Sequence, residues 1–512
     1  MLKLPIGIQT FQEIREGGYC YVDKTPLVAR LVEEGKYYFL SRPRRFGKSL
    51  LVSTLADAFA GHRALFAGLH LESHWDWARR HPVLQLDFGE GVLGTTALLD
   101  ASVALQLAEC AQAYGVTLTQ EPIHLRLHEL IRELHVRTGE RVAVLVDEYD
   151  KPILDHLDQP AVALELREGL KNLYSVFKSQ DAHLRFVLLT GVSKFSKVSL
   201  FSGLNNLKDI TLDERYATVC GYTQDELEDT FAGRLDGVDL AEVKNWYNGY
   251  NFLGEPVYNP FDVLLYLDNR EFRSYWFETG TPTFLIKLLQ ARRYSIPTIE
   301  SLEAGEELLG SFDVDAIEPE ALLFQTGYLT IRERYRRGNL YRYRLRYPNF
   351  EVRASLPTAI LNAYVPNIQD RLRTEDRIYA ALDADDPDGL YRAFHAFFAS
   401  IPHDWHRRNA IADYEGYWAS VVYCYFAALG LTVTPEDATN HGRIDLSILF
   451  AERAYLLEFK VVEADEPTGR ALAQLRARGY AQKFAGMPTT LIGMEFGREQ
   501  RNLVGFEWAR DG

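Results

Sequence analysis

The first 190 residues alternate short, continuous apolar runs with longer segments in which apolar residues recur every three or four positions. The apolar runs have the length of buried strands, and they span residues 37–40, 83–88, 142–146 and 186–190. The periodic segments are typical of amphipathic helices, and they span residues 50–60, 98–114, 122–138 and 160–179. Strands that alternate with helices in this way predict an α/β fold with a parallel sheet covered on both faces.

The pattern becomes irregular beyond about residue 213 and is mainly helical from 270 to 330. Two strand-like segments then flank a turn at Arg337-Gly338-Asn339, and they span Tyr328–Arg332 and Leu340–Arg346. A helix is expected just before them, at 319–325, so the hairpin resembles that of a winged helix. We therefore expect a helical, winged-helix-like middle region.

A third region follows an acidic turn at residues 383–389. Its pattern predicts a helix at 413–429, a hairpin across 443–462, a helix at 467–485 and a strand near 489–493. These elements indicate a second α/β unit. A chain of 512 residues has room for several domains of roughly 100–200 residues each. We place the three domains at residues 1–268, 269–375 and 376–512.

The formal net charge of the chain is −15. A protein this acidic does not bind nucleic acid through its overall field, so such a contact needs a local basic patch. No run reaches the roughly 18 consecutive apolar residues of a membrane span, and the N-terminus lacks an apolar signal core. We therefore expect a cytoplasmic protein without membrane contact. The four cysteines lie far apart, which disfavours a disulfide framework or a structural zinc site.

A Gly-Lys-Ser sequence stands between the first apolar strand and the helix after it, in SRPRRFGKSL. It matches the end of the phosphate-binding motif GxxxxGK[ST], with Arg42 in place of the first glycine. The following helix would point its first N–H groups at an anion. We expect Lys48 to reach the β- and γ-phosphates and Ser49 to hold Mg²⁺. The residues assigned to ATP are Arg44, Arg45, Phe46, Gly47, Lys48, Ser49 and Leu50.

Two acids, Asp147 and Glu148, end the apolar strand at 142–146 and supply the second element of a P-loop ATPase. We expect Asp147 to hold the metal ion, directly or through water, and Glu148 to polarise the attacking water. Asp150 is the next candidate for the role of Glu148. The strand at 186–190 ends in TGVSK, where Thr190 or Ser193 is a candidate sensor of the γ-phosphate. A capping or turn role is the alternative for both.

Residues 4 to about 265 resemble the bacterial AAA-ATPase-like family. The resemblance rests on LPIGIQTFQEIREGGYCYVDKT, SRPRRFGKSL, LVDEYDKPI and LTGVSKFSKVSLFSGLNNLKDIT, and it continues in WYNGYNF and VYNPFDV. Members of this family commonly lack the first glycine of the phosphate loop, so Arg42 agrees with the resemblance. They usually carry a C-terminal domain of the PD-(D/E)XK nuclease superfamily. The resemblance therefore implies an AAA-type P-loop domain at 1–268 and a restriction-endonuclease-like domain at 376–512.

The last region contains the acids and the lysine that a metal-dependent nuclease needs. Asp445 lies near the start of one strand, and the next strand, AYLLEFKVV, carries Glu458 and Lys460 on one face. Asp445 lies across the hairpin and is expected to reach that face. Two carboxylates would form a hard-oxygen site for Mg²⁺ or Mn²⁺, and Lys460 would position the attacking water. The alternative is a charge pair on an exposed strand face.

The resemblance to the nuclease superfamily implies further site residues. Glu415, on the preceding helix, matches the acid that often completes the metal site. Gln474 and Tyr480 match residues that commonly border it, and we assign them to nucleic-acid contact. The expected metal ligands are therefore Ser49 and Asp147 at the ATP site, with Glu415, Asp445 and Glu458 at the nuclease-like site.

Residues 332–346 hold seven arginines and three tyrosines in an otherwise acidic chain. Arginine pairs with phosphate oxygens and tyrosine stacks on bases. We assign nucleic-acid contact, with DNA favoured, to Arg336, Arg337, Arg342 and Arg344. One alternative is an edge hairpin kept soluble by charge. Another is that the arginines pair with the acidic ATPase face or act in trans on a neighbour's nucleotide.

The sequence supports three hypotheses of function. The first is an ATP-controlled, metal-dependent nuclease of DNA or RNA, with a role in defence or mobile-element control. The second is a regulatory ATPase whose nuclease-like domain is inactive and only binds nucleic acid or a protein. The third is a signalling ATPase that acts on protein. The intact Asp445, Glu458 and Lys460 favour the first. The substrate, the pathway and the oligomeric state, a homo-oligomer included, stay open.

Overall fold

The chain folds into two units, which we describe separately from a computed structural model. Unit 1 comprises Met1–Gly280 and Ala304–Tyr343, and unit 2 comprises Thr281–Glu303 and Arg344–Gly512. The three-domain division expected from the sequence stays a prediction. The residues that the structure describes are 2–194, 200, 204, 206–279, 283–292, 294–310, 317–365, 367–400, 415–439, 442–463 and 467–511.

A five-stranded parallel sheet forms the centre of unit 1, as predicted. Its order is β2-β3-β4-β1-β5, and each neighbouring pair is parallel. The strands are β1 (Tyr37–Ser41), β2 (Val83–Asp87), β3 (Val142–Asp147), β4 (Leu184–Gly191) and β5 (Lys208–Asp209). Because the strands are parallel, the segments that follow β1, β2, β3 and β4 all begin at one edge of the sheet.

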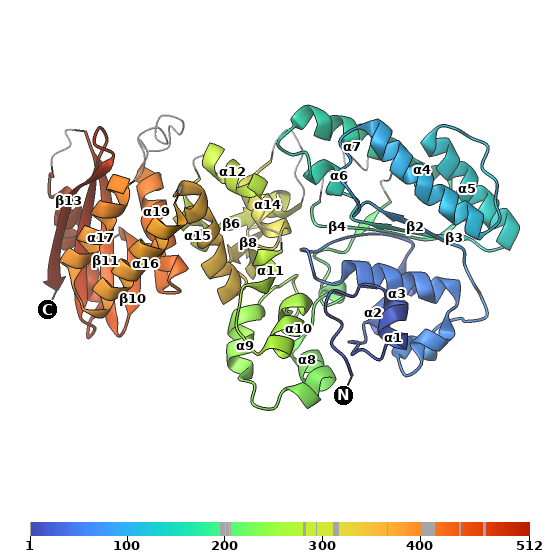
Figure 1. Ribbon diagram of the computed structural model, residues 1–512, viewed down its shortest axis with the longest axis horizontal. Helices are drawn as coiled ribbons and strands as arrows, with labels where there is room; N and C mark the ends of the chain where they lie inside the picture. The colour runs from blue at the N-terminus through green and yellow to red at the C-terminus, as the bar shows by residue number, and fades with distance from the viewer. Residues whose placement is uncertain are drawn as a thin grey trace. The chain divides into compact units, whose positions relative to one another are not determined.

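Helices cover both faces of this sheet. Figure 1 shows α1, α2 and α3 on one face and α4, α5 and α7 on the other. Their bounds are α1 (Phe11–Glu16), α2 (Thr25–Glu34), α3 (Lys48–Ala60), α4 (Thr96–Ala113), α5 (Ile123–Thr138) and α7 (Pro160–Ser179). Tyr38, Leu145 and Leu188 join the core beside α3, and β1 and β3 are buried along their whole length. Burial on both faces explains the continuous apolar runs in the sequence.

Shorter helices complete unit 1. They are α6 (Lys151–Leu154), α8 (Gln224–Phe231), α9 (Leu240–Tyr247), α10 (Pro260–Asn269), α11 (Tyr275–Glu278), α13 (Glu306–Gly310) and α14 (Pro319–Gln325). Among them, α8, α9 and α10 begin with a side-chain cap. Thr223 and Glu226 form a capping box on α8, and Asn259 caps α10. Cys20 and Val22 share a core with α8, α9 and α10, which fixes the N-terminal segment beside these helices.

A three-stranded sheet in the order β6-β8-β7 contains the arginine-rich hairpin. Its strands are β6 (Glu303–Gly305), β7 (Thr330–Arg337) and β8 (Leu340–Arg346). The prediction that the first hairpin strand spans Tyr328–Arg332 is wrong at both ends. The N–H groups of Tyr328 and Leu329 both donate to the Leu323 carbonyl at the end of α14, so the strand begins only after them. The winged-helix likeness stays a prediction.

Unit 2 is built on a sheet in the order β13-β12-β11-β10-β9. β11 and β12 are parallel, and the other neighbours are antiparallel. The strands are β9 (Thr432–Thr439), β10 (Gly442–Phe450), β11 (Arg453–Val462), β12 (Thr489–Gly497) and β13 (Asn502–Asp511). The helices are α12 (Thr283–Ala291), α15 (Phe350–Tyr364), α16 (Ile368–Asp383), α17 (Pro387–Ser400), α19 (Glu415–Ala428) and α20 (Arg470–Arg478).

The sequence correctly predicts the β10–β11 hairpin, but it predicts a single helix at 467–485 where the structure has two pieces. Gly479 has a φ of 59° and ends α20, and a 3₁₀ turn, η8 (Tyr480–Phe484), follows it. The edge strands β9 and β13 were not predicted. All four cysteines are free thiols. Among the described residues, no helix combines the length and apolar content that crossing a bilayer requires.

Candidate functional site

The segment Arg42–Ser49, which we call the 42–49 loop, leads from β1 into α3. Arg45 and Gly47 have φ values of 67° and 92°, and α3 begins at Lys48. A Cβ on Gly47 would meet no atom within 4 Å, so the positive φ rather than space favours glycine here. The first N–H groups of a helix have no partner within the helix, and they attract an anion. The local geometry is therefore that of an anion-binding turn.

Arg42, which replaces the expected first glycine, is an internal anchor of this loop. Its side chain is 1% exposed, and its guanidinium donates to the carbonyls of Ser41, Thr211, Tyr216 and Ala217 at 2.8 to 3.4 Å. The guanidinium carbon also lies 3.9 Å from the ring centroid of Phe252. Burial lowers the pKa of Arg42 to about 10. Arg42 therefore holds the start of the loop against the segment 211–217.

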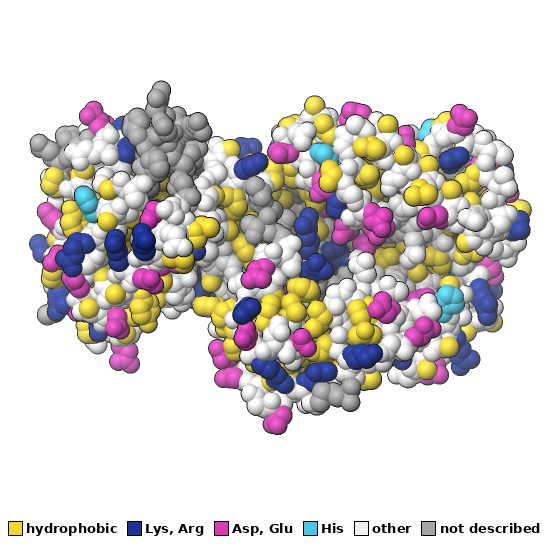
Figure 2. All heavy atoms as spheres, in the orientation of Figure 1, with side chains coloured by type: hydrophobic (Ala, Val, Ile, Leu, Met, Phe, Trp, Pro, Cys, Tyr) yellow, Lys and Arg dark blue, Asp and Glu magenta, His cyan; other side chains and the backbone are white. Residues whose placement is uncertain are grey.

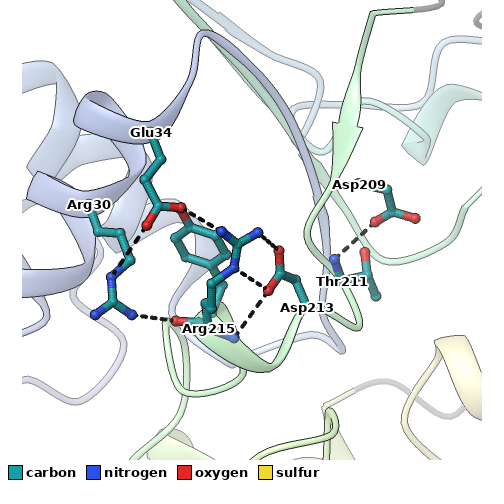
Figure 3. Close-up of polar contacts among 7 residues, drawn as sticks. Arg30, Glu34, Asp209, Thr211, Asp213 and Arg215 are labelled. Carbon is teal, nitrogen blue, oxygen red and sulfur yellow. Dashed lines mark hydrogen bonds and ion pairs between the residues drawn. The ribbon is translucent and has the colours of Figure 1, made fainter.

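The outer side of the segment 211–217 is fastened by ion pairs (Figure 3). Arg215 contacts Asp213 at 2.6 Å and Glu34 of α2 at 2.9 Å. Arg30, one turn earlier on α2, donates to the Arg215 carbonyl at 3.2 Å. The segment is thus held by α2 on its outer side and by Arg42 from within, which keeps the carbonyls that Arg42 needs in place.

Lys48 lies beneath the loop and is almost fully buried. Its ammonium donates to the carbonyls of Arg42 and Pro43 at 3.0 and 2.9 Å. Burial lowers its pKa, while nearby Asp147 and Glu148 act in the opposite direction. The lysine predicted to contact phosphate therefore stands between the loop and the acids at the end of β3.

Asp147 and Glu148 occupy the end of β3, as expected. Asp147 Oδ1 accepts hydrogen bonds from Thr190 Oγ1 and from the Glu148 N–H, the latter at 3.0 Å. Glu148 adopts a φ of 50°, a left-handed conformation that is uncommon for this residue type. Burial raises the pKa of Glu148, with Lys48 opposing that rise. The hydrogen bond from Thr190 thus fixes the Asp147 carboxylate, whereas the left-handed backbone turn sets the position of Glu148.

Asp87, which sequence reasoning missed, lies beside these acids. It ends β2 opposite Asp147 in the strand register, and burial raises its pKa. The Gly89 N–H donates to Asp87 Oδ1 at 2.7 Å, and a Cβ on Gly89 would lie 3.3 Å from Glu148 Oε2. The signal was present in the sequence, because the run PVLQLDF places an acid at the same edge of the sheet.

Ser193 and Phe46, both predicted to bind nucleotide, have buried side chains in this structure. Ser193 donates from its hydroxyl and its N–H to Asp150 Oδ2 at 2.5 and 2.6 Å. The ring of Phe46 packs 4.7 Å from that of Tyr250. These contacts leave only the backbone of Phe46 to face a phosphate. They also make Asp150, which is 1% exposed, a structural group joining the ends of β3 and β4.

A pocket of about 380 Å³ opens over the 42–49 loop, and all its lining residues belong to unit 1. Its charged and polar lining residues include Arg44, Arg45, Lys48, Ser49, Glu148 and Lys151. Its apolar lining residues include Pro5, Ile8, Tyr222, Pro260, Phe261 and Leu264. The two sets meet where the Arg45 guanidinium carbon lies 4.9 Å from the centroid of the Phe261 ring. Figure 2 shows Lys and Arg side chains gathered in a hollow of unit 1 beside acidic side chains.

The second site lies on β10 and β11 of unit 2. Asp445 Oδ2 accepts from the Phe459 N–H at 2.8 Å. Glu458 is 1% exposed, and its Oε1 accepts from Lys460 Nζ at 3.1 Å and from Gln474 Nε2. Its Oε2 is buried and has no hydrogen-bond partner in the described part of the chain. Burial, with the charge of Asp445, raises the pKa of Glu458 to about 7.

The position of α20 brings Gln474 to Glu458. A Cβ on Gly493 of β12 would lie 2.3 Å from the Leu472 nitrogen, so only glycine lets α20 approach this closely. Glu495, two residues further along β12, accepts from the N–H groups of Thr468, Gly469 and Ala471. A strand carboxylate therefore caps the N-terminus of α20. Neither residue was identified from the sequence.

Two other residues predicted for this site, Glu415 and Tyr480, are not seen to contribute to it in the part of the chain that the structure describes. Glu415 begins α19, but its side chain lies outside the described residues. Tyr480 is 2% exposed and packs in the core under α20, so it presents no surface to a nucleic acid here. Within the described ranges, no group of three or more His, Cys, Asp or Glu side chains is arranged to hold a metal ion. Asp445 and Glu458 are thus the two acids that the structure brings together.

The hairpin arginines are divided by their partners. Arg342 pairs with Glu307 at 3.4 Å, and Arg344 pairs with Glu303 at 3.3 Å. Arg336 and Arg337, at the end of β7, are exposed. The four arginines assigned to nucleic acid therefore do not form one uniform surface.

Comparison with known proteins gives matches to both halves of the chain. The family described as "Predicted AAA-ATPase" matches residues 5–201, and the "PD-(D/E)XK nuclease superfamily" matches residues 413–506. A relative from Azotobacter chroococcum mcd 1, described as "Uncharacterized protein in vnfD 5'region", is 57% identical over 507 residues, which is 98% of each chain. The chain therefore belongs to the family of predicted AAA-ATPases that carry a C-terminal PD-(D/E)XK nuclease superfamily domain.

Proposed function

We propose that the protein binds and hydrolyses ATP and couples this to metal-dependent cleavage of nucleic acid, with DNA favoured. The observation that carries the proposal is the pocket in which the N-terminus of α3, Lys48 and Glu148 meet. An anion-binding helix end opposite an acid suits phosphoryl transfer to water. The family matches support both activities at the level of domain type.

The charged and polar residues that line the pocket fit the triphosphate. The helix N–H groups and Lys48 bind the phosphate oxygens, and Lys48 exchanges its two carbonyl acceptors for them. Ser49 and Asp147 would supply the oxygen ligands that Mg²⁺ prefers, and the bound ion would supply positive charge to offset that of the phosphates. Glu148 orients the attacking water. Burial raises the pKa of Glu148 and the neighbouring charge of Asp87 adds to that rise, so a bound cation would be needed to favour the ionised form of Glu148.

The apolar residues that line the pocket fit a nucleoside. Pro5 and Ile8 line it from the N-terminal segment, and Tyr222, Pro260 and Phe261 line it from the segments around α8 and α10. Flat apolar walls of this kind bind the faces of a base. A nucleoside triphosphate would thus use both the charged and the apolar lining residues, whereas inorganic phosphate would use only the charged ones.

At the second site, the residues present fit a divalent cation. The buried, unpartnered Oε2 of Glu458 and the carboxylate of Asp445 are hard oxygen donors. A bound Mg²⁺ or Mn²⁺ would polarise the phosphodiester and the attacking water. Gln474 fixes the other oxygen of Glu458, and Lys460 is close enough to orient water at the same place.

One experiment tests both parts of the proposal. Purified protein is assayed for ATP turnover and for cleavage of single- and double-stranded DNA and RNA, in Mg²⁺ and in Mn²⁺. Turnover of ATP together with divalent-dependent cleavage supports the proposal. ATP turnover without cleavage under any of these conditions leaves only the ATPase.

A second function has a specific observation in its favour. The pKa of about 7 for Glu458 and the two donors already on its Oε1 also suit a carboxyl that serves structure. In that case the protein is a regulatory ATPase, and the nuclease-like domain only binds nucleic acid or a protein partner. The cleavage assay separates the two functions.

A further inference from the structure

The β7–β8 hairpin concentrates positive charge in a chain whose net charge is −15. Three of its arginines are neutralised within the protein. Arg334 pairs with Glu214, Arg342 with Glu307, and Arg344 with Glu303, at 2.5, 3.4 and 3.3 Å. A phosphate that binds one of these three arginines must first displace the carboxylate paired with it. The ion pair as a whole has no net charge, so it does not attract a phosphate from a distance. These positions therefore offer little to a polyanion.

The tip of the hairpin differs. Arg336 and Arg337 are exposed, and no ion pair joins either of them to another described residue. The Arg336 guanidinium lies 5.2 Å from the centroid of the Tyr341 ring. Leu340, between the turn and Tyr341, is 60% exposed. The tip thus joins two uncompensated cations to an exposed apolar side chain and a cation–aromatic stack.

This combination distinguishes between forms of nucleic acid. A duplex presents its phosphates, but its base faces are stacked inside the helix. A single strand presents phosphates and base faces together, and such strands bind surfaces that combine cations with stacking groups. A base placed on the Arg336 guanidinium would extend the stack on Tyr341. Leu340 would gain an apolar neighbour that a phosphate backbone does not provide.

We propose that the tip of the β7–β8 hairpin binds a single-stranded segment of nucleic acid, with Arg336 and Arg337 on its phosphates and an unstacked base against Leu340 and the Arg336–Tyr341 stack. The proposal rests on the proposed function in that it takes nucleic acid as the partner. The proposal goes beyond the proposed function because it specifies single-stranded nucleic acid. It also excludes from the contact surface the two arginines that pair with Glu303 and Glu307.

The test is fluorescence anisotropy of the full-length protein with a labelled oligothymidylate and with a labelled duplex, over a range of salt concentrations. Two variants are compared with wild type. R336A/R337A removes two positive charges at the tip. R342A/R344A removes two from the same hairpin and is the matched control. Thermal unfolding of both variants checks that they fold.

We expect wild type to bind the single strand more tightly than the duplex. R336A/R337A should lower the log–log salt slope for the single strand by about 1.4, since each lost phosphate contact removes about 0.7. That corresponds to about 25-fold weaker binding at 0.1 M salt. R342A/R344A should keep the wild-type slope. Tyr341→Leu should weaken single-strand binding several-fold without changing the slope.

Two results would overturn the proposal while leaving the proposed function intact. One is an equal loss of slope in the two double variants. The other is duplex binding that equals or exceeds single-strand binding in wild type. A wild-type protein that binds neither probe overturns the proposal and also removes nucleic acid as the partner in the proposed function.

Discussion

Arg42 stands where the phosphate loop would carry its first glycine, and its guanidinium donates to the Tyr216 carbonyl at 3.1 Å. The residue is therefore held in the protein interior and does not line the pocket over the 42–49 loop. The substitution that weakens the sequence motif thus strengthens the attachment of the loop to the segment 211–217. A buried guanidinium with several carbonyl acceptors is stable only while those acceptors stay in place.

Arg42→Ala should destabilise unit 1 by roughly 3 kcal/mol, because several buried carbonyls lose their donor at once. Arg42→Lys should recover only part of this, since one ammonium cannot reach four carbonyls. Calorimetric unfolding measures the loss. The matched control is Arg30→Ala, an exposed change in the same network that should shift stability by about 0.5 kcal/mol or less. Equal effects of Arg42→Ala and Arg30→Ala would show that Arg42 is not an anchor.

Lys48→Ala should abolish ATP turnover and weaken ATP binding, because it removes the cation beneath the loop. Titration calorimetry with ATP and with a non-hydrolysable analogue measures the affinity. Lys36→Ala, at the opposite end of β1, is the control and should bind as wild type does. Wild-type affinity in Lys48→Ala would contradict the assignment of the 42–49 loop to phosphate.

Glu148→Gln should bind ATP but hydrolyse it roughly 100-fold more slowly or worse, because the amide keeps the shape and loses the base. Asp150→Asn should instead lower thermal stability, since Asp150 accepts hydrogen bonds from Val192 and Ser193 in the interior. Single-turnover hydrolysis and thermal unfolding are measured for both variants. If Glu148→Gln turned over normally, Asp87 would become the leading candidate for orienting water.

Glu495→Ala should destabilise unit 2 by roughly 2 kcal/mol, because it uncaps the N-terminus of α20 and leaves the buried Ala471 N–H without an acceptor. Loss of this cap should also loosen Gln474 and thereby Glu458. Nuclease activity measured well below the unfolding temperature should therefore fall. Glu499→Ala, an exposed change beyond the same strand, should leave both properties unchanged. A stable, fully active Glu495→Ala would refute the positioning role.

The sequence predicts long elements well because they are buried on both faces or have a regular apolar stripe. It misses β9 and β13, which are the two edge strands of the second sheet. β9 includes Pro435 and three acidic or hydroxyl residues around it, and β13 includes Gly505, so neither carries a strong strand pattern. β9 and β13 form strands because they pair with β10 and β12, not because of a pattern in their own residues.

The candidate sites show the same division. Lys48, Asp147, Glu148, Asp445, Glu458 and Lys460 can be selected from local motifs, although their roles stay predictions. Asp87 has a local signal too, as the acid that ends the strand in PVLQLDF. Arg42, Gly493 and Glu495 have none, because their partners are distant along the chain. Arg42 contacts Tyr216, and Glu495 contacts the start of α20, through tertiary packing that no local pattern encodes. Local sequence motifs thus identify the candidate reacting residues, whereas the residues that position them are identified from the packing in the structure.

Nucleic-acid cleavage in Mn²⁺, with ATP turnover recorded in the same sample, tests whether one chain combines ATP hydrolysis with metal-dependent phosphodiester cleavage. We expect wild type to cleave and Asp445→Ala and Lys460→Ala not to cleave, while all three hydrolyse ATP at similar rates. Wild-type protein that hydrolyses ATP but cleaves no single- or double-stranded DNA or RNA would contradict this expectation.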